Sequence, residues 1–310
     1  MSENKNENKK KKKGFDIIST IIIIVCLIVF CVSAFNLGKI FREYKKADDE
    51  YDKLALMIPY YDDTSPEYVK PTEHEIDTQE YTEEETEEDD GYAEDDYTQA
   101  PEDGVTVEPP IVEIPPVIAP VFIDNVDWRA LYDTMHGINN DYQGWIYING
   151  TKINYPIVQG TDNDFYLGHT FYKEPVFSAC LFVDYRIEGG LEAKNPIVYG
   201  HNMKNGSMFA GLKKFMKSDF RNTHPSFSVY TSTGAYEYQV FSVYTTSPIS
   251  DTYRTSFADG EDFMNYVMMI KNRSDVKYPV DVYPQDKIIT LSTCVNNNKD
   301  RYIVHAKRIG

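Results

Sequence analysis

The sequence predicts a mainly β fold for residues 124–310, an eight-stranded barrel that is closed or nearly closed. Eight short runs rich in Val, Ile, Tyr and Phe are separated by turn residues, which is typical of sandwiches and barrels. The segment of about 185 residues is also long enough to bury one sizeable core. No internal repeat is visible, so we expect a single β domain.

The elements of this domain follow in order along the chain. A short helix is expected over 126–137, with Asp127 as its N-cap and Leu131 and Met135 four residues apart. The expected strands are residues 144–148, 153–158, 179–184, 196–199, 227–231, 235–245, 287–293 and 302–306. Helical inserts are predicted at 207–217 and at 260–272, where Phe263, Val267 and Ile270 have helical spacing.

The N-terminal region has the pattern of a membrane anchor. Lys9 to Lys13 form a basic cluster, and residues 15–35 are almost wholly apolar and long enough to cross a bilayer. The basic residues predict that 1–14 form a cytoplasmic tail, which leaves the rest of the chain outside. A cleaved signal peptide is the alternative, but its apolar region is usually only 7–15 residues long. A juxtamembrane helix is expected over 36–58.

Residues 59–123 have the composition of a disordered spacer. No Lys or Arg occurs between Thr72 and Trp128, and 20 carboxylates fall there; removing them leaves 29 acidic against 31 basic residues. The net charge of −18 therefore belongs to one segment, and no basic stripe suggests nucleic-acid binding. Charge repulsion and the prolines of 108–120 would extend such a tether to on the order of 190 Å. We interpret it as a spacer that holds the domain away from the membrane; a partner-binding acidic tail is the alternative.

Three side chains at strand ends predict acyl-transfer chemistry. Cys294 ends one strand pattern, Arg301 begins the next, and His201 lies in a loop rich in Gly, Asn and Ser. A thiol, an imidazole and a guanidinium supply a nucleophile, a proton carrier and an oxyanion partner. An unperturbed thiol is only a few per cent ionised at neutral pH, so a neighbouring cation would raise its reactive fraction.

The other histidines and cysteines have simpler interpretations. His305 alternates with apolar residues inside a strand and should be packed, whereas His169 and His224 lie in polar turns. Cys180 fits a buried strand, although a disulfide with Cys294 remains the alternative outside the cell. No histidine pair has metal-ligand spacing and no phosphate loop is visible, so we expect no metal and no cofactor.

These motifs resemble the sortase family, and its class B in particular. Leu291-Ser-Thr-Cys294, Arg301 and Val304-His-Ala-Lys307 resemble its active-site signature, and residues 199–209 (Tyr-Gly-His-Asn-Met-Lys-Asn-Gly-Ser-Met-Phe) resemble the class B form. The resemblance extends to residues 144–146, 155–159, 162–167 and 184–186 and to the helix at 260–272. It covers roughly 126–310 and implies a sortase-like eight-stranded barrel.

The resemblance implies a membrane-anchored cysteine transpeptidase of a Gram-positive surface. Cys294 would cleave a sorting motif of surface proteins through a thioester, with His201 moving the proton and Arg301 stabilising the oxyanion. The substrate groove would be lined by Asn163, Tyr199, Ser292 and Thr293. The acceptor would be an amine of a peptidoglycan precursor or wall peptide. The protein would cross the cell membrane once, with its N-terminus cytoplasmic and its catalytic domain extracellular.

Other functions remain open from the sequence. The same acyl-enzyme would polymerise pilins if the acceptor were a lysine side chain, and no sequence feature separates these acceptors. A non-catalytic peptide-binding surface module would not need all three of Cys294, His201 and Arg301. A papain-like protease is disfavoured, since that fold places its cysteine near the start of a helix. We expect the loop before 260–272 to border the acyl groove.

Overall fold

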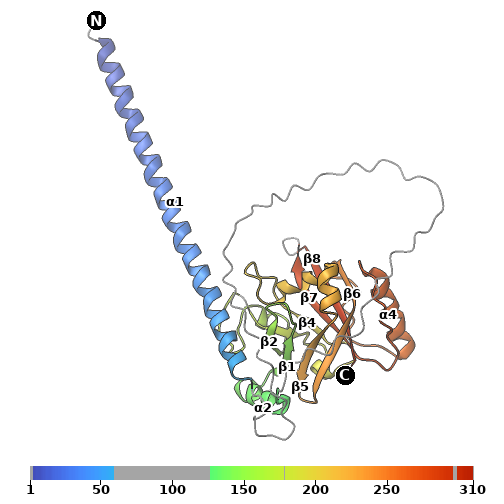
Figure 1. Cartoon of the computed structure of the whole chain (residues 1–310). Helices are drawn as coiled ribbons and strands as arrows, with labels where there is room; N and C mark the ends of the chain where they lie inside the picture. Colours follow the sequence, from blue (N-terminus) through green and yellow to red (C-terminus); the bar gives the residue numbers. More distant parts are fainter. Residues whose placement is uncertain (1–2, 59–125, 178, 296–298, 310) are drawn as a thin grey trace, which may run out of the picture.

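The computed structural model describes residues 3–58, 126–177, 179–295 and 299–309, and its centre is a closed barrel of eight strands (Figure 1). The strands follow the order β1-β2-β3-β4-β7-β8-β6-β5 around the barrel. Their bounds are β1 Tyr142–Tyr147, β2 Asn154–Val158, β3 Leu181–Val183, β4 Ile197–Tyr199, β5 Ser226–Thr231, β6 Ala235–Thr246, β7 Ile288–Val295 and β8 Asp300–Arg308. All eight predicted strands are present, and the mainly β barrel is confirmed.

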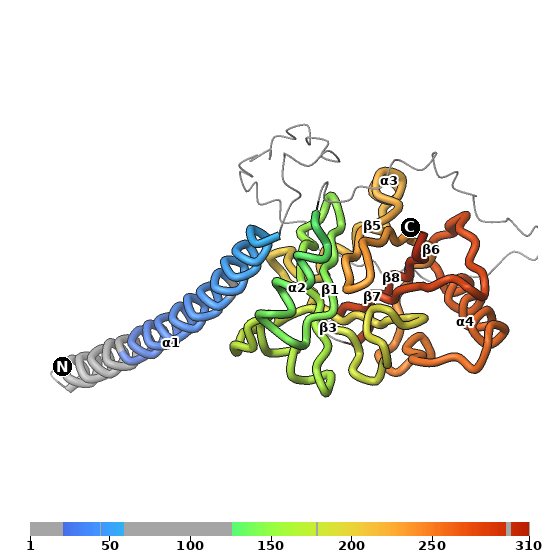
Figure 2. The backbone as a smooth tube through the Cα atoms, turned by 90° about the horizontal axis from the view of Figure 1, so that it is seen from below, coloured from blue at the N-terminus to red at the C-terminus, as the bar shows by residue number. Residues whose placement is uncertain are grey.

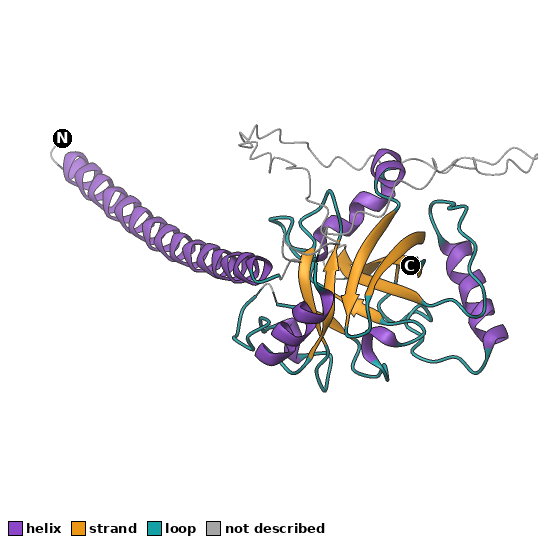
Figure 3. Cartoon of the chain, turned by 60° about the horizontal axis from the view of Figure 1, so that its bottom comes forward, coloured by secondary structure: helices purple, strands orange, loops and turns teal. Residues whose placement is uncertain are grey.

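Helices cover opposite sides of the barrel. Helix α2 (Trp128–Ile138) is capped by Asp127 as predicted, and it lies on the same side as the end of the long helix α1 (Figure 2). Helix α4 (Gly260–Arg273) lies on the other side (Figure 3). The helical insert predicted at 207–217 is a 3-10 helix, η3 (Phe209–Met216), followed by α3 (Ser218–Thr223). Short 3-10 turns also occur as η1 (Phe165–Leu167) and η2 (Gly190–Glu192).

Strand β7 brings three segments of the chain together at one end of the barrel. It pairs with β4 in parallel, with Tyr199 opposite Ser292, and with β8 in antiparallel, with Cys294 opposite Arg301. Parallel neighbours end at the same edge of a sheet, so the loop after β4 begins beside the end of β7. This topology, more than any single motif, decides which side chains can meet there.

Helix α1 (Glu3–Leu56) is continuous from the basic cluster to the barrel and extends far beyond it (Figure 1). Among the described residues it is the one helix long and apolar enough to span a membrane. Its last turns dock on the barrel, where Ala47, Tyr51, Leu54 and Ile58 are buried in the common core. The Tyr51 hydroxyl donates a 2.6 Å hydrogen bond to the Ala179 carbonyl, which fixes the docked end.

The acidic spacer predicted over 59–123 lies outside the described residues and stays a prediction. The described residues nearest to it on either side, Ile58 and Val126, are both buried in the same hydrophobic core. The end of α1 and the barrel therefore share one core. The sequence interpretation did not foresee this packing, because it treated the juxtamembrane helix and the barrel as separate bodies.

Candidate active site

Cys294 and Arg301 are brought together by the β7–β8 ladder. They occupy directly opposite positions of an antiparallel pair, and such residues place their side chains on the same face about 5 Å apart at Cβ. Both are partly exposed and both line one pocket of about 220 Å³. We name this cavity, which also contains Tyr199 and Tyr253, the arginine pocket.

His201 reaches the same place from the parallel neighbour β4. It follows Tyr199 by two residues, as Cys294 follows Ser292, and the Gly200 amide donates a 3.2 Å hydrogen bond to the Ser292 carbonyl. A side chain at Gly200 would overlap Phe209, since its Cβ would lie 2.7 Å from that ring. The glycine therefore lets the loop turn closely over η3 and carry His201 to the end of β7.

The hydrogen bond of the His201 ring identifies which nitrogen is available for proton transfer. Its Nε2 atom lies 3.0 Å from the Leu167 carbonyl oxygen, which can only accept, so Nε2 carries the proton. In the neutral ring Nδ1 is then the unprotonated nitrogen. Phe177 stacks on the other side of the ring at 6.3 Å between centroids and 10° between planes, which further restricts its orientation.

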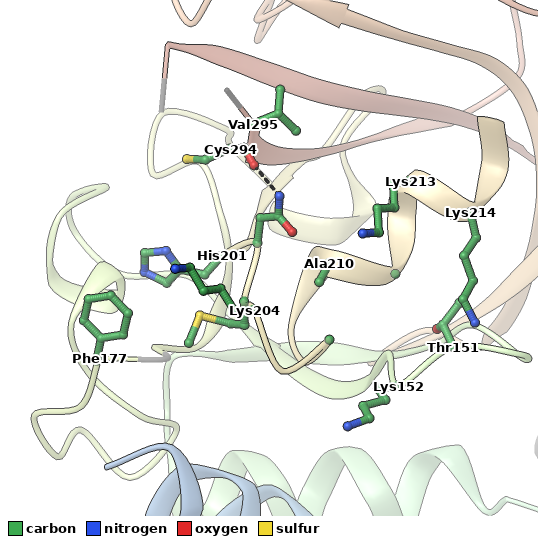
Figure 4. A pocket seen from close by; sticks show the side chains of 14 residues that line it. Thr151, Lys152, Phe177, His201, Lys204, Ala210, Lys213, Lys214, Cys294 and Val295 are labelled. Atoms are coloured by element: carbon green, nitrogen blue, oxygen red, sulfur yellow. Dashed lines mark hydrogen bonds between the residues drawn. The ribbon is translucent and has the colours of Figure 1, made fainter. Parts of the chain in front are cut away.

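Asn202 ties the histidine loop to the cysteine strand. Its Nδ2 donates a 2.8 Å hydrogen bond to the Cys294 carbonyl, drawn as the dashed line in Figure 4. The His201 carbonyl in turn accepts a 2.9 Å bond from the Phe209 amide, so the loop is held at both ends. The position of His201 relative to Cys294 is thus fixed by backbone contacts as well as by side chains.

The four predicted substrate-binding residues all line the arginine pocket. Asn163 is half-buried and accepts a 3.0 Å hydrogen bond from the Tyr185 amide. Ser292 and Thr293 are only 1% and 3% exposed, so they can form its floor but not its rim. The buried Thr293 hydroxyl has no hydrogen-bond partner within the described part of the chain.

Tyr199 is held in the pocket wall by a buried carboxylate. Its hydroxyl donates a 2.9 Å hydrogen bond to Asp184, which also forms a two-point ion pair with Arg186. Burial opposes ionisation of Asp184, but the hydrogen bonds from Arg186 and Tyr199 outweigh it and lower the pKa of this carboxyl. Burial and the Asp184 charge raise the pKa of Tyr199, so it remains a neutral donor. The motif at 184–186 therefore positions Tyr199.

The sequence did not reveal the contributions of Tyr253, Leu167 or Asn202 to this site. Tyr253 and Pro248 belong to the loop before α4 and border the arginine pocket, in agreement with the expectation for that loop. The Tyr253 hydroxyl lies 3.0 Å from the Ser292 hydroxyl, 39 residues away in sequence. Only the position of Leu167 and Asn202 within recognisable motifs could have indicated their importance.

The remaining histidines and cysteines that the structure describes lie outside the site. His305 is fully buried between Tyr244 and Thr290, and burial lowers its pKa to about 3, in agreement with its predicted packed role. Cys180 is buried and unpaired, so the alternative disulfide is absent. His169 and His224 each stack on a phenylalanine. No group of three potential ligands that could hold a metal occurs among the residues described.

Comparisons with known proteins identify relatives of this chain. Residues 146–309 match the family model described as the sortase domain. Sortase B of Listeria monocytogenes is 40% identical over 175 residues, covering 56% of this chain and 71% of that protein. The structure of Clostridium perfringens sortase B has a TM-score of 0.54 and 37% identity, and the match covers 57% of this chain and 99% of that one. A Staphylococcus aureus sortase B–substrate complex matches with a TM-score of 0.55 and 34% identity, covering 58% and 85%.

Proposed function

Because this chain belongs to the sortase family, in its class B, we propose that it cleaves a sorting motif in surface proteins and joins the new acyl end to an amine of the cell wall. The family makes the chain a sortase transpeptidase. The observation that carries the finer assignment is the convergence of Cys294, His201 and Arg301 on one pocket at the end of β7.

In the first half-reaction, Nδ1 of His201 takes the proton of the Cys294 thiol, and the resulting thiolate attacks the scissile carbonyl carbon of the sorting motif. The carbon–nitrogen bond breaks, and His201 gives the leaving amine a proton from Nδ1, since Nε2–H remains bonded to the Leu167 carbonyl. The product is a thioester between Cys294 and the acyl part of the surface protein. In the second half-reaction Nδ1 accepts a proton from the incoming amine, which displaces the thiolate.

Arg301 stabilises the charge that develops on the carbonyl oxygen in both half-reactions. Its guanidinium borders the same pocket as Cys294 and donates to the Asp300 carbonyl at 3.0 Å, which restricts its position. A preorganised donor of this kind is typically worth 10²–10³ in rate. Asn163, Tyr199, Ser292 and Thr293 bind the residues of the motif that precede the scissile bond.

The N-terminal half of α1 anchors the enzyme in the cell membrane, with residues 1–14 in the cytoplasm and the barrel outside. The predicted span ends at Phe35 and the docked face of α1 begins at Ala47, which is roughly 18 Å along a helix at 1.5 Å per residue. The barrel therefore stays close to the outer face of the cell membrane, where membrane-attached surface proteins and lipid-linked wall precursors are present.

A transpeptidation assay tests this function. The full chain in detergent micelles is incubated with a pool of sorting-type peptides and two amines, a wall-peptide amine and a lysine-bearing pilin peptide, and the ligated products are resolved by mass. Ligation to the wall-peptide amine supports the proposal. Ligation only to the pilin lysine would assign pilin polymerisation instead, and binding without any covalent product would identify a peptide-binding module.

A further inference from the structure

A second pocket adjoins Cys294 and is not lined by Arg301. It has a volume of about 880 Å³ and shares only His201 and Cys294 with the arginine pocket. Four lysines line it, Lys152, Lys204, Lys213 and Lys214, and we name it the lysine pocket (Figure 4). No Asp or Glu is among the described residues that line it.

The charges of these lysines are poorly neutralised. All four are exposed, and none forms an ion pair with a carboxylate in the described part of the chain. Lys152 and Lys214 donate to the backbone carbonyls of Asn205 and Gly150, and Lys152 lies near the Asp48 carboxylate of α1. Four like charges around one concavity produce a positive potential that attracts anions.

The position of the lysine pocket relative to His201 assigns it to the amine side of the reaction. If the acyl chain occupies the arginine pocket beside Arg301, the nitrogen that leaves or enters must lie across Cys294 from it. The same imidazole serves both the leaving and the entering amine, and it borders the lysine pocket. A group attached to the acceptor nitrogen therefore extends among the lysines.

We infer that the lysine pocket is the acceptor subsite, and that it selects a primary amine whose attached peptide carries carboxylate groups. This inference rests on the proposed function and specifies its acceptor. Lys204, which follows the histidine loop, and Lys213 of η3 make no side-chain hydrogen bond among the described residues, so both ammonium groups are available to such a ligand. Without these two ammonium groups the pocket keeps only Lys152 and Lys214, which already donate to backbone carbonyls, so its attraction for carboxylates should weaken.

A competition between two acceptors tests the inference. The full chain in micelles receives the sorting-peptide pool and equal amounts of Gly-Gly-Glu, with free carboxylates, and Gly-Gly-Gln amide, which has none. The ratio of the two ligated products, measured by mass spectrometry, reports acceptor choice independently of the rate of acylation. We expect the carboxylated amine to be favoured at least about fivefold in 50 mM salt, with the preference falling in 0.5 M salt because the attraction is screened.

Variants assign that preference to the pocket. The double variant Lys204→Gln/Lys213→Gln should lower the product ratio to less than half of the parent value, whereas Lys217→Gln/Lys277→Gln, which removes two exposed lysines elsewhere, should retain it. An equal ratio in the parent protein, or an equal loss in the control variant, would overturn the inference while leaving the acyl transfer intact. Failure to form any acyl adduct would instead overturn the proposed function on which it rests.

Discussion

Cys294 lies directly opposite Arg301 in the β7–β8 ladder. On its other side, Tyr199 of the parallel strand β4 lies opposite Ser292, and His201 follows Tyr199 by two residues just as Cys294 follows Ser292. The proposed nucleophile is thus flanked on one side by a cation and on the other by the proposed proton carrier. This arrangement makes the effects of substitutions at each position distinguishable.

Replacement of Arg301 tests oxyanion stabilisation. Arg301→Ala should lower kcat about 10²–10³-fold, since a preorganised donor is lost from the transition state. Arg301→Lys should recover only part of the rate, because a single ammonium cannot reproduce the fixed fork of the guanidinium. Steady-state transpeptidation kinetics measure both, with Arg254→Lys as the control. If Arg301→Ala raised KM alone, Arg301 would bind substrate without stabilising the transition state.

The link between Asn202 and the Cys294 carbonyl predicts a positioning effect. Asn202→Ala removes the 2.8 Å hydrogen bond, so the end of β7 should become less well oriented and kcat should fall about tenfold, equivalent to about 1.4 kcal/mol. KM should change little. Asn272→Ala, an exposed substitution on α4, is the matched control. Equal kcat values for the two variants would show that the contact does not position Cys294.

The partly buried carboxylate of Glu192, in η2, predicts that acid destabilises the fold. Burial opposes ionisation of Glu192, but hydrogen bonds from Thr231, Thr233 and Lys287 outweigh it and lower its pKa to about 2 from an ordinary 4.5. A lowered pKa contributes stability above pH 4.5 that is lost as the pH falls toward 2. Glu192→Gln should therefore reduce the free energy of unfolding at pH 7 by about 1–3 kcal/mol, with a smaller difference at pH 3. Urea unfolding at the two pH values measures this.

The exposed Glu188→Gln variant is the control for that experiment, and its unfolding free energy should match the parent at both pH values. If Glu192→Gln lowered the free energy of unfolding more at pH 3 than at pH 7, the pH trend would be opposite to the expected one. Such a result would mean that the Glu192 carboxylate destabilises the barrel.

The docked end of α1 predicts that this helix stabilises the barrel. Leu54 is fully buried against the domain, so Leu54→Ala should cost about 2–4 kcal/mol in unfolding free energy. Leu56 is 86% exposed two residues later, and Leu56→Ala should cost almost nothing. Thermal unfolding of the full chain in micelles compares them. Equal melting temperatures for the two variants would contradict the docking.

The sequence predicted those features that depend on local pattern. All eight strands, the α2 cap at Asp127 and the packed state of His305 follow from alternation, capping and side-chain chemistry, and the structure contains each. The meeting of Cys294 and Arg301 was also predictable, since a hairpin returns the chain to its starting point.

Features that depend on distant contacts were not predictable from one sequence. The Leu167 carbonyl bonds His201 across 34 positions, and the Tyr253 hydroxyl meets Ser292 across 39. The helical insert predicted at 207–217 is present as the 3-10 helix η3, and the sequence did not indicate the 3-10 form. The docking of α1 required the apolar faces of two segments on either side of the acidic region to be recognised as one interface.

Intact-mass spectrometry detects whether Cys294 forms a covalent acyl intermediate. The full chain and its Cys294→Ala variant are incubated in parallel with the pool of sorting-type peptides, without an added amine. We expect a peptide-sized mass increase on the parent alone. Both proteins should be folded, because the partly exposed Cys294 is not part of the core. An adduct on both proteins, or turnover by the alanine variant, would contradict this expectation.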